Sequence, residues 1–170
     1  MIVRTASTSD TAAIERVARA TWRVDYPDVL NRENTADAAT DWYDESAMTT
    51  AIERDDALVL VASLENEVVG FAHAYVAENW GDLLRLYVAP GYRERGVGTA
   101  LLDRTVDDLF EAGVDEIRAM VLAANEHGRA FYEASGFELV DEDAETEIDG
   151  ERYRECRYRL DTGRGTTADD

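Results

Sequence analysis

The stretch DLLRLYVAPGYRERGVGTALL, residues 82–102, decides how the rest of the chain is interpreted. Alternating apolar residues predict a strand at its start, with Leu84, Leu86 and Val88 on one face, and a helical pattern follows from residue 97. Arg93, Gly96 and Gly98 stand between the two elements. Glycines leave backbone N–H groups uncovered, and the start of a helix adds the positive end of its dipole. The arrangement predicts a phosphate-binding turn.

The spacing of the glycines argues against two common nucleotide-binding motifs. A dinucleotide-binding fingerprint that begins at Gly96 needs glycine or alanine at position 101, where the chain has Leu101. A P-loop needs Gly-Lys-Ser/Thr, and the stretch has no lysine. A nucleotide-binding regulator is therefore disfavoured. A turn that only joins strand to helix stays an alternative interpretation.

The stretch resembles motif A of the GNAT superfamily of N-acetyltransferases, Gln/Arg-x-x-Gly-x-Gly/Ala. Arg93, Gly96 and Gly98 match the motif, and Pro90 and the strand at 86–88 precede it as in many members. The resemblance implies an enzyme that passes the acetyl group of acetyl-CoA to a primary amine by direct attack in a ternary complex. A non-catalytic acyl-CoA-binding sensor or scaffold of the same fold is the alternative.

The order of predicted elements extends the resemblance over residues 1–160. Strands are expected at 1–5, 58–64, 68–77, 82–88, 116–122, 137–141 and 151–160, and helices at 10–20, 35–54, 97–111 and 123–135. This is the GNAT order, an α/β (α+β) fold with a mixed central sheet of about seven strands flanked by about four helices. One domain is expected over 1–160, followed by a polar tail at 161–170 that is predicted to be disordered.

The charge of the chain is its compositional outlier. There are 17 basic residues, all of them arginine, against 37 acidic ones, which gives a net charge of −20. Because the acids are spread along the chain, adaptation to a salt-rich cytoplasm is the favoured interpretation, so a halophilic source is expected. Steering of polycationic acceptors is the alternative. Nucleic-acid binding is disfavoured because no basic patch is visible.

Two further features favour a cytoplasmic protein without membrane contact. The first residues, MIVRTASTSD, contain no apolar signal core, and no apolar run approaches the roughly 20 residues of a membrane span. The single cysteine, Cys156, has no partner for an intramolecular disulfide and no His or Asn arrangement that would make it a nucleophile. A homodimer stays open, because subunit pairing is common in the family.

The resemblance assigns the cofactor contacts. Arg93 and the backbone of the glycine-rich turn would hold the pyrophosphate of coenzyme A, with Arg95 nearby, and the motif strand would pair with the pantetheine arm. The residues implied are Leu86, Tyr87, Val88, Arg93, Arg95, Gly96, Val97, Gly98 and Thr99.

A second family motif is matched by NEHGRAFYEASGF, residues 125–137. Asn125 and Tyr132 are seven residues apart, about two helical turns, so both can face the cofactor from one side of a helix. The resemblance implies that Asn125 contacts the pantetheine arm and that Tyr132 protonates the thiolate. Tyr132 as a core aromatic residue beside Phe131 and Phe137 is the alternative, and Asn125 also suits a helix N-cap.

The general base is assigned to Asp82 at the head of the motif strand, where many members of the family carry an acid. It stands four residues before Leu86 and is expected on the same strand face. Glu78, in the preceding turn, and a water chain are the rivals. His73 and His127 are interpreted as structural, and a metal site is not expected.

The amine acceptor stays undetermined. A peptide N-terminus, a lysine side chain, a polyamine and a small metabolite all fit the chemistry. Aromatic residues of the N-terminal helical region are expected either to line the acceptor pocket or to pack in the core: Trp22, Tyr26, Trp42 and Tyr43. The loop near Asp149 is the other expected determinant of acceptor choice.

Overall fold

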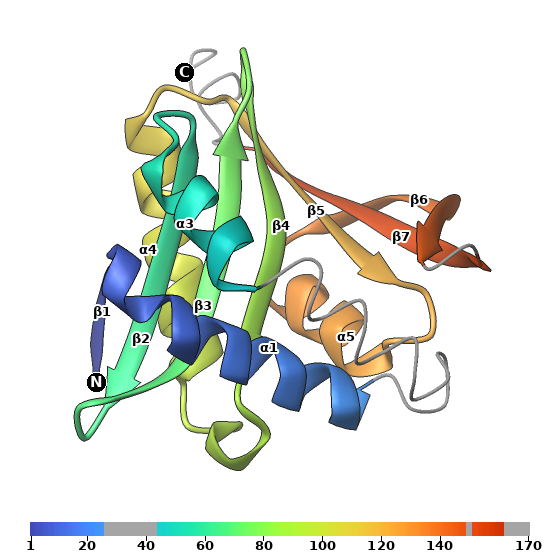
Figure 1. The fold of residues 1–170 in the computed structure, drawn as a ribbon. Helices are drawn as coiled ribbons and strands as arrows, with labels where there is room; N and C mark the ends of the chain where they lie inside the picture. Colours follow the sequence, from blue (N-terminus) through green and yellow to red (C-terminus); the bar gives the residue numbers. More distant parts are fainter. Residues whose placement is uncertain (26–43, 149–150, 162–170) are drawn as a thin grey trace.

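The computed structural model describes residues 1–25, 44–148 and 151–161 (Figure 1). The strands are β1 (Ile2–Thr5), β2 (Ala57–Leu64), β3 (Glu67–Val76), β4 (Trp80–Val88), β5 (Glu116–Leu122), β6 (Glu138–Ile148) and β7 (Glu151–Asp161). The helices are α1 (Thr11–Asp25), α3 (Glu45–Glu53), α4 (Val97–Glu111) and α5 (Glu126–Ala134), with short 3-10 turns η1 (Thr8–Asp10) and η2 (Pro90–Tyr92). None of these described helices is long and apolar enough to cross a membrane.

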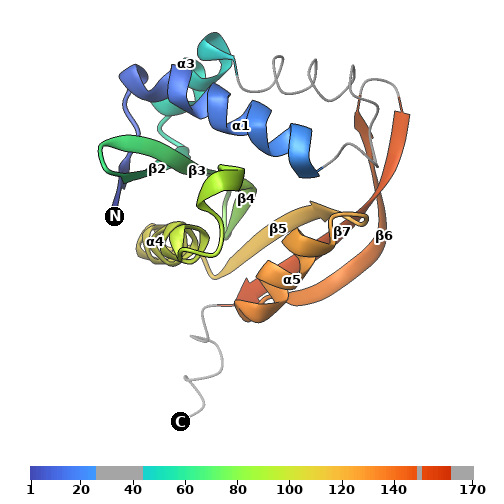
Figure 2. The ribbon, with the colours of Figure 1, turned by 90° about the horizontal axis from the view of Figure 1, so that it is seen from below.

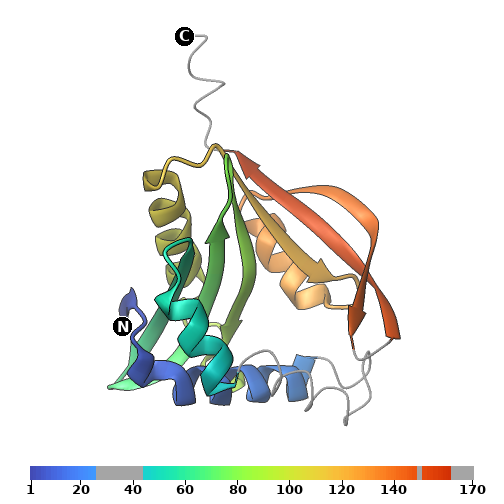
Figure 3. The ribbon, with the colours of Figure 1, turned by 45° about the horizontal axis from the view of Figure 1, so that its top comes forward.

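The seven strands form one mixed sheet in the order β1-β2-β3-β4-β5-β7-β6. β4 and β5 run parallel, and the other neighbouring pairs are antiparallel. α1 and α3 cover one face of the sheet, while α4 and α5 lie on the other (Figures 2 and 3). The predicted mixed α/β fold is therefore confirmed, with α4 and β5 starting and ending at the predicted residues.

Both faces of the central strands are buried, which explains the continuous apolar run of β2. Val59 and Val61 join the cluster under α1 and α3, while Leu60 and Ala62 join the cluster under α4. A strand covered on both faces needs apolar residues at successive positions rather than at alternate ones.

α4 packs closely over two glycines of the sheet. A Cβ at Gly81 would lie 2.9 Å from a methyl carbon of Leu109, and a Cβ at Gly70 would lie 3.0 Å from one of Leu101. A larger residue at either position would require these leucine side chains to shift, and at Gly70 its Cβ would also lie 2.9 Å from the backbone oxygen of Tyr87. The helix that follows the glycine-rich turn thus packs directly on β3 and β4.

β4 and β5 pair only over their first halves. Trp80–Leu83 pairs with Glu116–Ala119, but β4 continues to Val88 and β5 to Leu122 without further pairing between them. The two strands diverge beyond that point, and the sheet splits into a β1–β4 half and a β5–β7–β6 half (Figures 1 and 3). The ladder between β4 and β5 thus ends at Leu83, and β5 is separated from residues 84–88.

β6 is longer than predicted, running to Ile148 rather than to residue 141. Its acidic composition hid the strand, because Glu and Asp are poor strand formers. In the structure these acids stand opposite the arginines of β7, with Glu145 paired to Arg154 and Glu147 to Arg152 in the register. Opposite charges on facing strands offset the poor propensity.

Several predicted features lie wholly or partly outside the described residues. These are the first part of the helix at 35–54, the aromatic residues Tyr26, Trp42 and Tyr43, the loop at 149–150 and the tail from residue 162. Asp161 was predicted to begin the tail, but it is the last residue of β7, opposite Glu116. The extent of the single domain stays a prediction.

Candidate functional site

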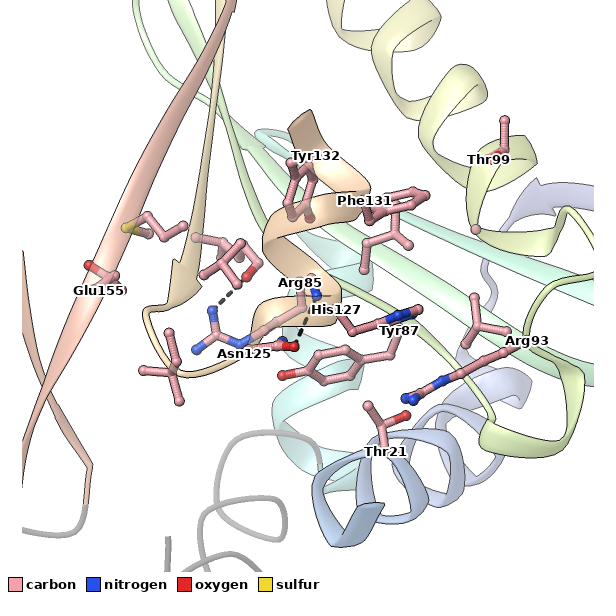
Figure 4. Close-up of a pocket in the computed structure, with 18 of the residues that line it drawn as sticks. Thr21, Arg85, Tyr87, Arg93, Thr99, Asn125, His127, Phe131, Tyr132 and Glu155 are labelled. Atoms are coloured by element: carbon pink, nitrogen blue, oxygen red, sulfur yellow. Dashed lines mark hydrogen bonds between the residues drawn. The ribbon is translucent and has the colours of Figure 1, made fainter. Parts of the chain in front are cut away.

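A pocket occupies the separation between β4 and β5 (Figure 4). Nine residues that the sequence indicated lie in its lining: Leu86, Tyr87, Val88, Arg93, Gly96, Gly98, Thr99, Asn125 and Tyr132. They come from the end of β4, the turn that leads into the start of α4, and α5 with its N-cap Asn125. The fold thus brings together two motifs that are nearly 30 residues apart in the chain.

The N-terminus of α4 lacks the side-chain cap that other helices have. Asp44 accepts a hydrogen bond from Ala47 N at α3 (2.7 Å), and Asn125 accepts one from Gly128 N at α5 (2.9 Å). The N-cap of α4 is Gly96, with a left-handed φ of +81° and no side-chain hydrogen bond. An uncapped helix start leaves N–H groups and the positive dipole end for an anion.

The helical ladder of α4 starts at Ala100 N, which donates to Gly96 O at 3.0 Å. The N–H groups of residues 97–99 precede that bond, as the first N–H groups of any helix do. Arg93 adds a positive side chain that points into the pocket toward Thr21 and Tyr87 (Figure 4). Charge and backbone donors converge at this end of the pocket, which suits a phosphate group.

Two predicted cofactor residues are not part of the pocket lining. Arg95 is exposed, and its guanidinium lies 5.6 Å from the centre of the Tyr92 ring. Val97 is buried in the core under α4, with 1% of its surface exposed. Only the backbone of Val97, at the helix start, is placed to meet a ligand, and Arg95 stands outside the pocket.

Tyr132 is at once a core aromatic residue and a pocket residue. It is 6% exposed, with ring centroids 5.4 Å from Phe131 and 5.3 Å from Phe137, and it stacks on Tyr158 at 6.1 Å. It also lies in the pocket lining on α5 with Asn125 (Figure 4). The two interpretations of Tyr132 are therefore compatible, because the aromatic cluster fixes a ring that borders the pocket.

Asp82 does not share a strand face with Leu86, so that expectation was wrong. Asp82 stands opposite Tyr75 and Leu86 opposite Ala72, which lie on opposite faces of β3. A β-bulge inserts Leu84 between them and inverts the alternation. The carboxylate of Asp82 accepts a hydrogen bond from Trp80 Nε1 at 3.3 Å and lies outside the pocket lining, as does the exposed Glu78.

Among the other lining residues are four polar or charged side chains on the α1 side that were missed in the sequence. They are Thr21 of α1, Arg85 of β4, Thr146 of β6 and Glu155 of β7. Three come from elements that carry no recognisable motif. The one local signal was for Glu155, the single acid between residues 152 and 160 in a run rich in arginine.

Glu155 is the buried carboxylate of the site, 9% exposed. Its carboxylate lies 3.6 Å from Arg157 Nε. Burial raises the pKa of the Glu155 carboxyl, and the positive charges of Arg157 and Arg85 oppose that rise. Desolvation favours the protonated form of an acid, so Glu155 binds a proton more readily than an exposed glutamate does.

His73 stands opposite Arg85 in the β3–β4 register. Burial lowers the pKa of His73 to about 4, and the charges of Arg85 and Arg54 add to the effect. Its Nε2 has no hydrogen-bond partner among the described residues. The imidazole is thus neutral at pH 7. Among the described residues no group of His, Cys, Asp and Glu is arranged to hold a metal ion.

Comparison with known proteins gives a consistent result. The sequence model of a protein family, described as Acetyltransferase (GNAT) family, matches residues 13–137 of this chain. A spermidine N(1)-acetyltransferase of Thermoplasma acidophilum is 28% identical over 155 residues, 89% of this chain and 96% of that protein. An acetyltransferase of Sodalis glossinidius is 30% identical over 118 residues, covering 69% and 83% of the two chains.

A solved structure extends this similarity to the fold. The PaiA N-acetyltransferase of Thermoplasma acidophilum, in complex with coenzyme A, superposes with a TM-score of 0.80 at 26% identity. The match covers 91% of this chain and 96% of that one.

Proposed function

The chain belongs to the acetyltransferase (GNAT) family, and on this premise we propose that it transfers the acetyl group of acetyl-CoA to a primary amine by direct attack in a ternary complex. Its membership of this family makes it an acetyl-CoA-dependent N-acetyltransferase. The observation that carries the mechanism is the pocket between β4 and β5, where an uncapped helix start, the diverging ends of the two strands and Tyr132 meet.

The pocket offers groups that suit both the pyrophosphate and the pantetheine arm of coenzyme A. Arg93 and the N–H groups at the start of α4 would bind the pyrophosphate, since helix N-termini and arginine both favour phosphate. The β4–β5 ladder ends at Leu83, so the pantetheine arm would run along β4 at Leu86–Val88 like an added strand. Asn125 would contact the arm from α5.

The chemistry needs one proton removed and one supplied. A neutral amine attacks the thioester carbonyl carbon, a C–N bond forms, the C–S bond breaks, and the departing thiolate takes a proton. We assign that proton to Tyr132, which borders the pocket with its ring fixed by neighbouring aromatics. Two carboxylates compete to remove the amine proton: Asp82, predicted at the head of β4, and Glu155 in the pocket lining.

The acceptor we favour is a cationic amine. A net charge of −20 attracts positively charged amines toward the protein before they bind. The curated relative named as a spermidine N(1)-acetyltransferase, matched over 96% of its length, makes a polyamine the first amine to test. A lysine side chain and a peptide N-terminus share the same amine chemistry and belong in the same panel.

The direct test is acetyl transfer itself. The protein is incubated with isotope-labelled acetyl-CoA and a panel of spermidine, a lysine peptide, a peptide with a free N-terminus and a small alkylamine, and products are identified by mass spectrometry. We expect one labelled N-acetyl product and an equal amount of free coenzyme A thiol. Binding of coenzyme A without any product would instead support the sensor or scaffold function.

A further inference from the structure

The pocket between β4 and β5 passes from one face of the sheet to the other. Leu86 lies on the face that α4 covers, whereas Arg85 and Tyr87 stand opposite His73 and Phe71 on the α1 side. All three line the pocket. A thioester in the gap is therefore accessible from both faces.

Glu155 and Tyr132 lie on opposite sides of this gap. Val121 faces α5, because its Cγ1 lies 3.1 Å from a Cβ built on Gly128. Leu122 is the next residue of β5 and faces the other way, and Glu155 stands directly opposite Leu122. Glu155 is thus on the face away from α5, and Tyr132 on α5 borders the same pocket from the other face.

We propose that Glu155 is the general base, which receives the ammonium group of the acceptor on the α1 side of the sheet and takes its proton. The assignment rests on the proposed acetyl transfer. The first proton moves from the ammonium nitrogen to the Glu155 carboxylate, and the neutral amine attacks the thioester carbon to form the C–N bond. The nitrogen then loses its second proton to water, and the C–S bond breaks toward α5. Tyr132 protonates the thiolate on that side, so that base and acid act from opposite faces; water then restores the proton of Tyr132 and removes the one on Glu155.

The surroundings of Glu155 suit this role. Its burial limits competition from water, and burial also raises its pKa toward that of a useful base at neutral pH. The charged side chains acting on it are Arg157 on its own strand and Arg85 on β4. Both are positive, so they favour the ionised carboxylate and oppose the rise in pKa that burial causes. Thr146, also in the pocket lining, adds a hydroxyl near the same wall.

Asp82 fits the role less well. It lies on the same face as Glu155, but at the closed end of the gap, where it pairs with Arg118 in the β4–β5 register. Its carboxylate accepts a hydrogen bond from Trp80 and is not part of the pocket lining. An amine entering the open end reaches Glu155 first.

The test is the pH profile of acetylation by Glu155→Gln, using an amine that the wild-type protein acetylates. Glutamine keeps the size and polarity of the side chain but cannot accept the proton. We expect kcat/KM for the amine to fall by roughly 10²–10⁴-fold at pH 7. The loss should shrink as pH approaches about 10, because solvent then deprotonates the amine itself. Glu155→Asp should restore part of the activity at pH 7.

Two control variants, the pH profile of Glu155→Gln and the wild-type activity decide the outcome. Glu145→Gln on β6 removes an exposed carboxylate paired with Arg152 and should match the wild type. Asp82→Asn is measured in parallel, and the same pH-dependent loss in that variant, with Glu155→Gln active, overturns the assignment. The assignment is also overturned if Glu155→Gln binds coenzyme A like the wild type but loses the same fraction of kcat/KM at every pH. A wild-type protein that acetylates no amine overturns the proposed function, and this role with it.

Discussion

The two ends of the pocket are built in different ways. The proposed cofactor end comes mainly from residues 86–99, with Asn125 added from the start of α5, and uses backbone groups at the start of α4 and along β4. The proposed acceptor end uses side chains of Arg85, Thr146 and Glu155, which come from three separate strands. A backbone site requires glycines at fixed spacing and leaves a motif in the sequence, whereas a side-chain site depends on strand register and leaves none.

The largest effect is expected where the two ends meet, at Tyr132. Tyr132→Phe removes the hydroxyl but keeps the ring among Phe131 and Phe137, so kcat should fall by roughly 10²–10⁴-fold while coenzyme A affinity is unchanged. Steady-state rates and calorimetric titration measure the two quantities. Tyr158→Phe, whose hydroxyl bonds Arg129 and Glu133 outside the pocket, is the matched control. An unchanged kcat in Tyr132→Phe would remove it from the mechanism.

The second effect concerns the stability of the folded protein and the buried His73 on the α1 side of the sheet. His73 has a folded pKa of about 4, below its unfolded value of about 6.5, so the unfolded state binds the extra proton between those two pH values. The free energy of unfolding should therefore fall by about 3 kcal/mol as pH drops from 6.5 to 4. Urea denaturation across this range measures it. His73→Gln should lose less over the same interval, and an equally steep loss in that variant would contradict the assignment.

The third effect belongs to the cofactor end alone. Arg93→Ala removes the arginine that points into the pocket, and a hydrogen bond to a charged group contributes about 1.5–3 kcal/mol. Coenzyme A should bind roughly 10- to 150-fold more weakly. Calorimetric titration checks this against Arg104→Ala on the outer face of α4, where the arginine bonds Asp108. Equal coenzyme A affinities in the two variants would show that Arg93 does not bind the phosphates.

The smallest effect tests the backbone of the cofactor end. Gly96 has a φ of +81°, which a residue with a Cβ adopts at a cost of about 1–2 kcal/mol, although nothing lies within 4 Å of that Cβ. Gly96→Ala should lower the free energy of unfolding by this amount and also weaken coenzyme A binding. Gly91→Ala is the control, because its Cβ is equally free and its φ is not left-handed. Equal stability of the two variants would contradict the argument from φ.

The sequence predicted the parts of the fold whose signals are local. The helix at 97–111 and the strand at 116–122 were correct to the residue, because their apolar periods are regular and Gly96 and Gly113 lie beside the ends of the helix. β6 was too short in the prediction, since its acids are stabilised by arginines on another strand. Such cross-strand compensation cannot be read from either strand alone.

The residues of the candidate site were likewise predictable only where their signal is local in the sequence. Nine pocket residues were indicated by the two motifs, but a single inserted residue, Leu84, inverted the face assigned to Asp82. Glu155 stands out as the single acid of an arginine-rich run, but its place in the pocket depends on the pairing of β7 with β5, which no local pattern encodes. Spacing along the chain therefore located the proposed cofactor end, and only register located the proposed acceptor end.

The division of the pocket into two ends is tested most directly by titrating coenzyme A into Glu155→Gln and Arg93→Ala and measuring kcat/KM for the amine in both. Arg93→Ala should weaken coenzyme A binding. Glu155→Gln should bind coenzyme A like the wild type and lose amine acetylation at pH 7. Weakened coenzyme A binding in Glu155→Gln, or unchanged amine acetylation in that variant, would contradict the account.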